Sequence, residues 1–259
     1  MAVSDYQLIE AWQEVLRLSK LQAGQTVTLL TSSTTNQQTM QCAQIAAQSM
    51  GAVVNRLDLL PVNAEKALSR DPLAYLGTTP LTGNEAAIAA LKASDLVLDL
   101  MTLLFSPEQI DILKSGTKIL LAVEPPEILV RTVPTEADRA RVTAAAALIK
   151  AAKEMSITSP AGTNLRCPLG EFPAIREYGF VDEPGRWDHW PSGFVLTWPN
   201  ELGTNGTIPA DGCEVLQGFL YGEAVPAETL RAHARERLPE HMVPAAYVRL
   251  PELPRTPNG

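Results

Sequence analysis

The sequence lacks the features that mark several large classes of protein. Its three cysteines lie far apart, at Cys42, Cys167 and Cys213, and form no CxxC pair, which argues against a zinc knuckle or a disulfide framework. No apolar run is long enough to span a bilayer, and the first residues show no signal-peptide pattern. We therefore expect a reducing, cytoplasmic setting with no membrane partner.

Basic residues and nucleotide-binding motifs are scarce as well. The formal net charge is -8, the isoelectric point is near 5.0, and no stripe of lysine and arginine appears. An acidic chain of this kind is a poor partner for nucleic acid. Neither GxGxxG nor GxxxxGK[ST] occurs, so a familiar nucleotide-binding loop is not supported.

The chain does contain enough apolar sequence, 46% of its residues, for a packed core. Short apolar runs alternate with helical patterns, and the runs are continuous, as strands buried on both faces require. This pattern predicts an α/β fold: a parallel, Rossmann-like sheet with helices on both faces. The expected strands are 26–30, 52–59, 96–100, 118–123 and 155–159, and the expected helices are a Ser4-capped first helix, 37–49, 84–92, one from 108, and 135–152.

Three short segments come directly after predicted strands: 31–35, 99–105 and 124–126. Ligands of parallel α/β sheets usually bind beyond the carboxyl ends of the strands, so these segments could line a cleft. Taken one at a time, serine and threonine after a strand are more often turn or helix-cap residues.

Residues 171–201 form a segment unlike the rest, with three of the four tryptophans and many glycines and prolines. Such a segment is expected to be irregular and rigid, which suits a site. We expect three regions: an α/β domain over 1–160, this Trp-rich segment within 161–211, and a small α+β tail over 212–259. The charged residues Asp182, Glu183, Arg186 and Asp188 are expected to pair with one another as a structural network.

The Trp-rich segment also carries a resemblance. EYGFVDEPGRWDHWPSGFVLTWPNE (177–201), LLFSPEQIDILKSGTKILLAVEPPEIL (103–129) and LTGNEAA (81–87) resemble the 2,5-dihydroxypyridine 5,6-dioxygenase family over the first 205 to 210 residues. The resemblance implies a non-haem Fe²⁺ enzyme of nicotinate degradation, which uses O₂ to open a small aromatic ring to N-formylmaleamate. It also implies a fold shared with a group of metal-dependent aminopeptidases, and a homo-oligomer is compatible with it.

The resemblance suggests the site residues. Glu177 and His189 fall where the family has active-site residues, Glu177 for proton handling or substrate contact and His189 for a bond to the substrate or to a neighbouring group. Trp187, Trp190 and Phe105 are the expected substrate contacts. A histidine flanked by two tryptophans is about as often a satisfied structural residue, and a glutamate at position 177 can equally cap a helix or join a salt bridge.

Two departures from the family bear on activity. The family has a histidine where this chain has Phe105, and phenylalanine cannot exchange a proton. The family's iron ligands, a His-Ser-His-Asp set, lie in its carboxyl-terminal half, to which no residue of this chain corresponds. The metal ligands are therefore unknown, and we expect an impaired enzyme. Non-catalytic binding of a small aromatic molecule and a metallopeptidase-like activity remain as alternatives.

The end of the chain carries a second, unrelated resemblance. RERLPEHMVPAAYVRLPELPRTPNG (235–259) resembles the carboxyl-terminal subdomain of adenylation domains in non-ribosomal peptide synthetases. This region predicts strands at 215–221 and 246–250 and a helix ending at Leu238. His233 and His241 lie in its arginine-rich part and show no recognisable metal spacing. The chain therefore looks like two joined pieces that meet near Asp211, by rearrangement, by a frame error or by design.

Overall fold

The computed structural model describes residues 3–60, 79–104, 106–160, 162–200 and 203–207. The chain divides into two compact units: Met1–Ala152 with Gly170–Trp198, and Lys153–Leu169 with Pro199–Gly259. The predicted tail (212–259), with its strands and helix, and the loop-rich part at 61–78 lie outside the described residues. The domain boundaries drawn from the sequence stay predictions.

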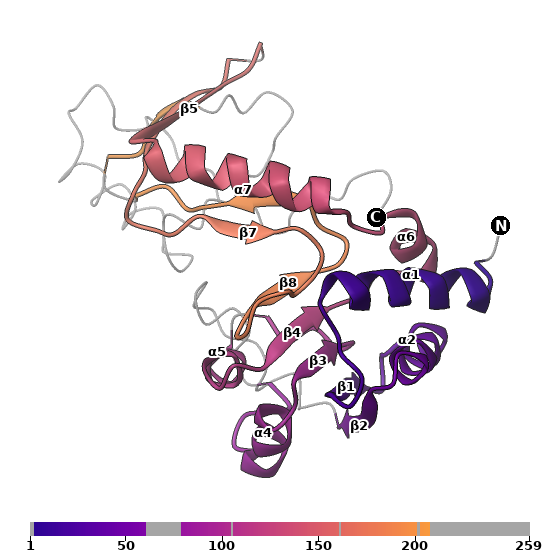
Figure 1. Cartoon of the computed structure of the whole chain (residues 1–259). Coiled ribbons are helices and arrows are strands. Elements are labelled where there is room, and N and C mark those ends of the chain that lie inside the picture. Colours follow the sequence, from indigo (N-terminus) through magenta and orange to yellow (C-terminus); the bar gives the residue numbers. More distant parts are fainter. Residues whose placement is uncertain (1–2, 61–78, 105, 161, 201–202, 208–259) are drawn as a thin grey trace, which may run out of the picture. The chain divides into compact units, whose positions relative to one another are not determined.

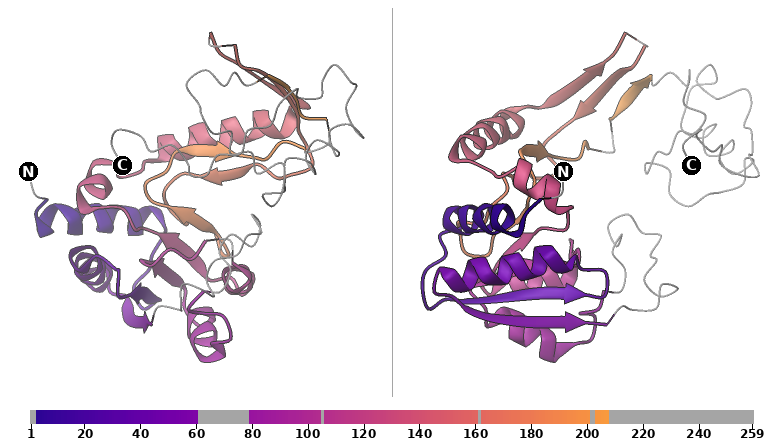
Figure 2. Two further views of the ribbon diagram at one scale, coloured as in Figure 1. Left: turned by 180° about the vertical axis from the view of Figure 1, so that it is seen from behind. Right: turned by 90° about the vertical axis from the view of Figure 1, so that its right-hand side faces the viewer.

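The first unit is built on a five-stranded parallel sheet in the order β2-β1-β3-β4-β8. Its strands are β1 (Thr26–Ser32), β2 (Val53–Leu59), β3 (Leu96–Asp99), β4 (Lys118–Leu121) and β8 (Trp187–His189). Figure 2 shows β1 and β2 running in the same direction beneath a helix. The predicted parallel α/β fold is thereby confirmed, and the first four strands lie where the apolar runs indicated.

Helices cover both faces of this sheet, as Figure 1 shows. They are α1 (Asp5–Leu18), α2 (Gln37–Ser49), α4 (Glu85–Lys92) and α5 (Pro107–Lys114). Two further helices of this unit are α6 (Pro126–Arg131), which contacts α1, and α7 (Glu136–Ala151). One apolar cluster joins α1 and α2 to Leu29, Leu98 and Leu120 of the sheet. The other joins α4 and α5 to residues of the same strands that point the opposite way, such as Val97 and Ile119. This alternation is why both faces of the strands had to be apolar.

Local sequence explains where most helices begin. Ser4 and Thr135 each form a capping box with the third helical residue, Gln7 and Asp138. The sequence missed α6, because the pair Pro125-Pro126 was taken as the end of the unit. Proline is well suited to the first turn of a helix, where its missing N–H costs nothing, and Pro126 occupies that place in α6.

The remaining strands are short and antiparallel. In the first unit β7 (Ile175–Glu177) pairs with β9 (Phe194–Leu196), and both contact α7. In the second unit β5 (Glu154–Thr158), β6 (Asn164–Pro168) and β10 (Asn205–Thr207) form a separate sheet. The strand expected at 155–159 thus exists as β5, in a hairpin with β6.

Candidate functional site

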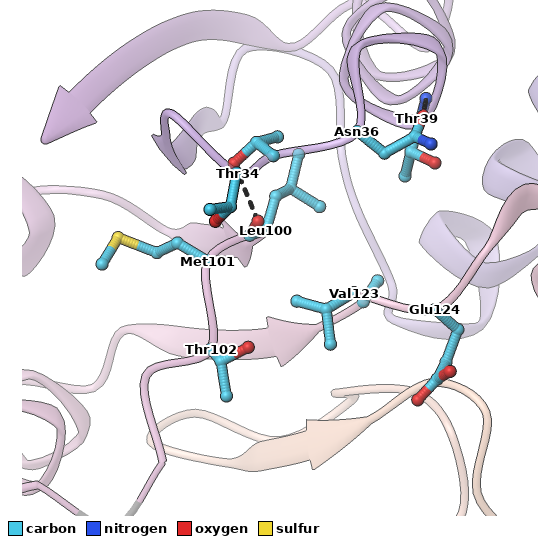
Figure 3. A pocket seen from close by; sticks show the side chains of 10 residues that line it. Thr34, Asn36, Thr39, Leu100, Met101, Thr102, Val123 and Glu124 are labelled. Carbon is cyan, nitrogen blue, oxygen red and sulfur yellow. Dashed lines mark hydrogen bonds between the residues drawn. The ribbon is translucent and has the colours of Figure 1, made fainter. Parts of the chain in front are cut away.

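A cavity of about 300 Å³ lies at the carboxyl ends of β1, β3 and β4, within the first unit. Figure 3 shows the side chains around it. The cavity is lined by Thr34, Thr35, Asn36, Thr39, Leu100, Met101, Thr102, Ala122, Val123 and Glu124. All three segments predicted from the strand-end rule contribute to this wall, so that prediction is confirmed. The sequence missed Asn36 and Thr39, which come from the first turn of α2.

Hydrogen bonds hold the cavity wall in shape. Thr35 Oγ1 accepts from the backbone N–H of Ser32 at 2.9 Å and donates to the carbonyl of Leu100 at 2.9 Å. This side chain therefore ties the loop after β1 to the loop after β3. Asn36 caps α2 by accepting from the Thr39 N–H at 2.9 Å. A signal for Asn36 was available, since an asparagine directly before a helical pattern is a typical cap.

Asp99 fixes the loop after β3 through hydrogen bonds to the loop backbone. Its fully buried carboxylate accepts the backbone N–H groups of Met101 at 3.0 Å and Leu103 at 2.5 Å. Burial raises the pKa of Asp99 to about 7, although these backbone hydrogen bonds lower it. Thr102, between the two donors, has a φ of 70°, a left-handed conformation that such local bonding can stabilise. Asp99 thus shapes the wall, and the residues after it face the cavity.

The parallel pairing of β4 with β8 places His189 beside the cavity-lining Glu124. Leu121 is the register partner of His189, and the Trp190 N–H donates to the Leu121 carbonyl at 2.8 Å. His189 Nε2 lies 3.7 Å from Glu124 Oε1. Burial lowers the pKa of His189, and the Glu124 carboxylate partly offsets this effect.

Asp188 is the centre of the segment that carries Glu177 and His189. Its buried carboxylate accepts the backbone N–H groups of Tyr178, Gly179 and His189 at 2.8–3.1 Å, and the Arg186 guanidinium at 2.5 Å. The Arg186 guanidinium also lies 3.7 Å above the ring of Tyr178. The expected network is confirmed for Arg186 and Asp188.

Asp182 has other partners than the sequence suggested. It pairs with Lys20 at 3.3 Å and Arg139 at 2.9 Å, and it accepts the Tyr178 hydroxyl at 2.7 Å. Lys20 lies two residues after the end of α1 and Arg139 lies in α7, whereas Tyr178 belongs to the Trp-rich segment itself. Asp182 therefore anchors the Trp-rich segment to the helices, and Asp188 organises it internally.

Glu177 ends β7 directly before Tyr178 and is only 3% exposed. Burial raises its pKa to about 7, repulsion from Asp188 adds to this effect, and Arg186 opposes it. A carboxyl group that titrates near neutrality can hold or release a proton under ordinary conditions. Glu177 is not one of the residues that line the cavity.

The tryptophans of the segment lie in different surroundings. Trp190 is fully buried, packs edge-on against Trp12 with ring centres 4.9 Å apart, and donates its Nε1–H to the Thr132 carbonyl at 3.0 Å. Trp187 packs against the cluster on the opposite face of the sheet. Neither belongs to the cavity wall, and Phe105 lies outside the described residues. Substrate contacts by these three residues stay predictions, and Trp190 has the packing of a core residue.

The described residues do not fit the iron that the resemblance implies. His189 is the one histidine among them, and they contain no group of three histidine, cysteine, aspartate or glutamate side chains that could hold a metal ion. Non-haem iron needs about three such ligands. The described part of the chain also has no helix with the length and apolarity needed to cross a membrane.

The fold and the cavity define a parallel α/β protein whose candidate site lies where such sheets hold small ligands. A model of the family 2,5-dihydroxypyridine 5,6-dioxygenase matches residues 7–219, and the chain belongs to that family. The match includes Glu177, His189 and every residue of the cavity wall.

Relatives agree with this assignment. The chain is 49% identical over 219 residues to the 2,5-dihydroxypyridine 5,6-dioxygenase of Pseudomonas putida, which covers 85% of this chain and 63% of the relative. The solved structure of 2,5-dihydroxypyridine dioxygenase from P. putida KT2440 is 51% identical, with a TM-score of 0.75, over 80% of this chain and 60% of that one. The chain thus spans somewhat under two thirds of the length of these relatives.

A short part of the chain is similar to peptide synthetases. Malpibaldin synthetase of Mortierella alpina is 61% identical over 65 residues, which is 23% of this chain and 1% of that protein. A dimodular nonribosomal peptide synthase of Bacillus subtilis is 57% identical over 37 residues, which is 14% of this chain and 2% of that protein. Matches this short indicate a local similarity to synthetases.

Proposed function

We propose that this chain binds a 2,5-dihydroxypyridine and takes part in the O₂-dependent opening of its ring to N-formylmaleamate. The observation that carries the proposal is the extent of the family match, from residue 7 to 219, because it includes the whole cavity as well as Glu177 and His189. A cavity of about 300 Å³ has room for one small ring, at the low end of the usual range for ligand sites.

The geometry supports binding and proton handling by this chain. Glu124 offers a carboxylate to a ligand hydroxyl in the cavity, and Glu177 titrates near neutrality. The described residues supply no ligand set for Fe²⁺, so no iron-dependent step is assigned to them. We therefore propose weak turnover at most, in a cytoplasmic and reducing setting where Cys42 and Cys167 remain free thiols.

The proposal is tested in two stages on the full chain. Under nitrogen, 2,5-dihydroxypyridine should quench tryptophan fluorescence in a saturable way, because Trp187 and Trp190 lie on either side of His189, whose imidazole is 3.7 Å from the cavity-lining Glu124. Ferrous iron and O₂ are then added in an oxygen electrode, and uptake well below that of the P. putida enzyme is expected. Absence of saturable binding would overturn the proposal.

The second candidate is a binding module without catalysis. It is favoured by the lack, among residues 3–60, 79–104, 106–160, 162–200 and 203–207, of any group of three metal-ligand side chains. Saturable binding with no iron-dependent O₂ uptake would identify it. A metallopeptidase-like activity requires the same kind of cluster and has no observation in its favour. The synthetase-like origin proposed for residues 212–259 adds no activity to either candidate.

A further inference from the structure

One ring nitrogen of His189, Nε2, has no hydrogen-bond partner among the described residues. Nε2 is buried and lacks a partner within normal bonding distance. Oε1 of Glu124 lies 3.7 Å away, whereas a hydrogen bond to nitrogen rarely exceeds about 3.2 Å. An unpaired buried polar atom costs roughly 1–3 kcal/mol, so a small movement that closes this gap is favoured.

Glu124 is the more exposed member of the two, with more room for its side chain to rotate. Its side chain is 37% exposed and that of His189 is 22% exposed. Glu124 lines the cavity, on the side away from Thr34 in Figure 3, and His189 does not belong to the wall. The backbone N–H of His189 is held by Asp188 at 2.8 Å, and the next residue is paired to Leu121. Rotation of the glutamate side chain therefore brings the two groups together.

We propose that Glu124 is the cavity-facing acceptor of this site and that His189 acts through it: the Nε2–H of His189 donates to one oxygen of Glu124, and the other oxygen accepts a hydroxyl or ring N–H of a bound hydroxypyridine. The ligand part rests on the proposed function. His189 is then a positioning residue, and Glu124 is the residue that touches the ring. No bond is broken in this arrangement, and both protons stay on their donors.

Among the described residues, a second charged group near His189 is Asp188, and its carboxylate is fixed. Asp188 is next to it on β8, but its carboxylate is occupied by Arg186 and by backbone N–H groups, including that of His189 itself. On the neighbouring strand β4, the register partner of His189 is the apolar Leu121. Glu124, in the loop after β4, is thus the carboxylate that can respond to the imidazole.

Histidine titration by NMR tests the pair without any ligand. The chain has three histidines, and His189→Gln identifies the resonance of interest. Glu124→Gln should lower the pKa of His189 by roughly half a unit, because a nearby partly exposed carboxylate contributes about that much. Glu127→Gln, three residues along and exposed, is the matched control and should leave it unchanged. Equal titration in Glu124→Gln and wild type overturns the pair.

A measurement on the wild type guards against a variant that fails to fold. Nitrogen chemical shifts at high pH report which ring nitrogen carries the proton. The proposal requires the proton on Nε2, since only then can His189 donate to Glu124. A proton on Nδ1 overturns the pair even if Glu124→Gln cannot be purified.

Ligand binding tests the cavity-facing role separately. The probe is 3-hydroxypyridine, which needs neither iron nor O₂, followed by tryptophan fluorescence. Glu124→Gln should weaken binding about tenfold, since a hydrogen bond to a charged acceptor contributes roughly 1.5 kcal/mol or more. Glu127→Gln should bind like the wild type. Equal affinity in Glu124→Gln overturns the role.

The outcomes also separate this inference from the proposed function. If the wild type binds neither 3-hydroxypyridine nor 2,5-dihydroxypyridine, the proposed function and the ligand contact of Glu124 both fail. A pKa shift of His189 in Glu124→Gln would still establish the pair. If the wild type binds both molecules and Glu124→Gln does too, the proposed function stands and Glu124 has no part in it.

Discussion

Glu177 and Asp188 are two buried carboxylates that the protein treats differently. Asp188 receives three backbone N–H groups and the Arg186 guanidinium. Burial and repulsion from Asp188 raise the pKa of Glu177, and Arg186 partly offsets this increase. The pKa of both is raised, and that of Glu177 reaches about 7. The arrangement keeps one carboxylate as a structural anchor and leaves the other ready to exchange a proton.

This contrast predicts a pH dependence that Glu177→Gln should remove. A carboxyl whose pKa is about 7 in the folded state, against 4.5 ordinarily, binds its proton more tightly when folded. Its contribution to stability is therefore full below pH 4.5 and is lost as the pH rises through 7. Between pH 5 and pH 8 the wild type should lose about 2–3 kcal/mol more than Glu177→Gln.

Urea unfolding followed by tryptophan fluorescence at pH 5, 6, 7 and 8 measures this difference. Glu127→Gln, which removes an exposed carboxylate, should follow the wild type at every pH. Parallel curves for Glu177→Gln and wild type would show that Glu177 is ionised in the folded protein throughout this range.

Individual residues differed in how far the sequence could predict them. The wall residues Thr34, Thr35 and Glu124 followed from a topological rule, because parallel strands end at one edge. Glu177 and His189 lie in the Trp-rich segment that the composition marked as a site, and their roles came from the resemblance. Nothing in the sequence showed that Glu124 would lie beside His189, because they are 65 positions apart and the β4–β8 pairing brings them together.

At the scale of elements, β8 is the strand of the parallel sheet that the sequence could not predict. Strands β1, β3 and β4 are largely apolar or β-branched runs, β2 mixes apolar with polar residues, and all four were found. Strand β8 has three residues, Trp-Asp-His, of which only one is apolar. Between β4 and β8 the chain forms α6, α7 and strands of two other sheets. The place of β8 depends on tertiary contacts, which a short pattern does not encode.

One of these contacts is a close backbone approach at Gly185, just before β8. Its N–H donates to the Gly116 carbonyl at 2.9 Å, and a Cβ at this position would lie 2.7 Å from the Leu113 carbonyl oxygen. Gly116 also has a positive φ, but a Cβ there would meet nothing within 4 Å. The two glycines therefore differ in crowding and share the left-handed conformation.

Substituting each glycine by alanine separates these two effects. Gly116→Ala should cost about 1 kcal/mol of unfolding free energy, from backbone conformation alone. Gly185→Ala should cost roughly 2 kcal/mol more, because α5 and the start of β8 must move apart. Denaturant unfolding measures both. Equal losses in the two variants would mean that the approach at Gly185 relaxes without cost and does not position β8.

At the scale of the whole molecule, the chain matches the family, but its described residues contain no ligand group for the metal that the resemblance implies. The family match covers residues 7–219, yet the chain spans only 63% of the length of its P. putida relative. Among the described residues the sheet, the cavity and the Trp-rich segment are all present, and a three-ligand group is not. The proposed binding of the ring can therefore be tested separately from the binding of iron.

We therefore expect the full chain to bind iron weakly. After anaerobic equilibration with Fe²⁺ and gel filtration, it should retain well under one iron per chain, because the described residues hold His189 as their one histidine and no group of three metal-ligand side chains. Iron analysis by a colorimetric chelator gives the stoichiometry, and His189→Gln should retain as little as the wild type.

His233 and His241 lie outside the described residues, so His233→Gln and His241→Gln form the decisive comparison. One tightly held iron per chain would contradict the prediction. Loss of that iron in either variant would place its ligands in the synthetase-like region, outside the part that holds the cavity.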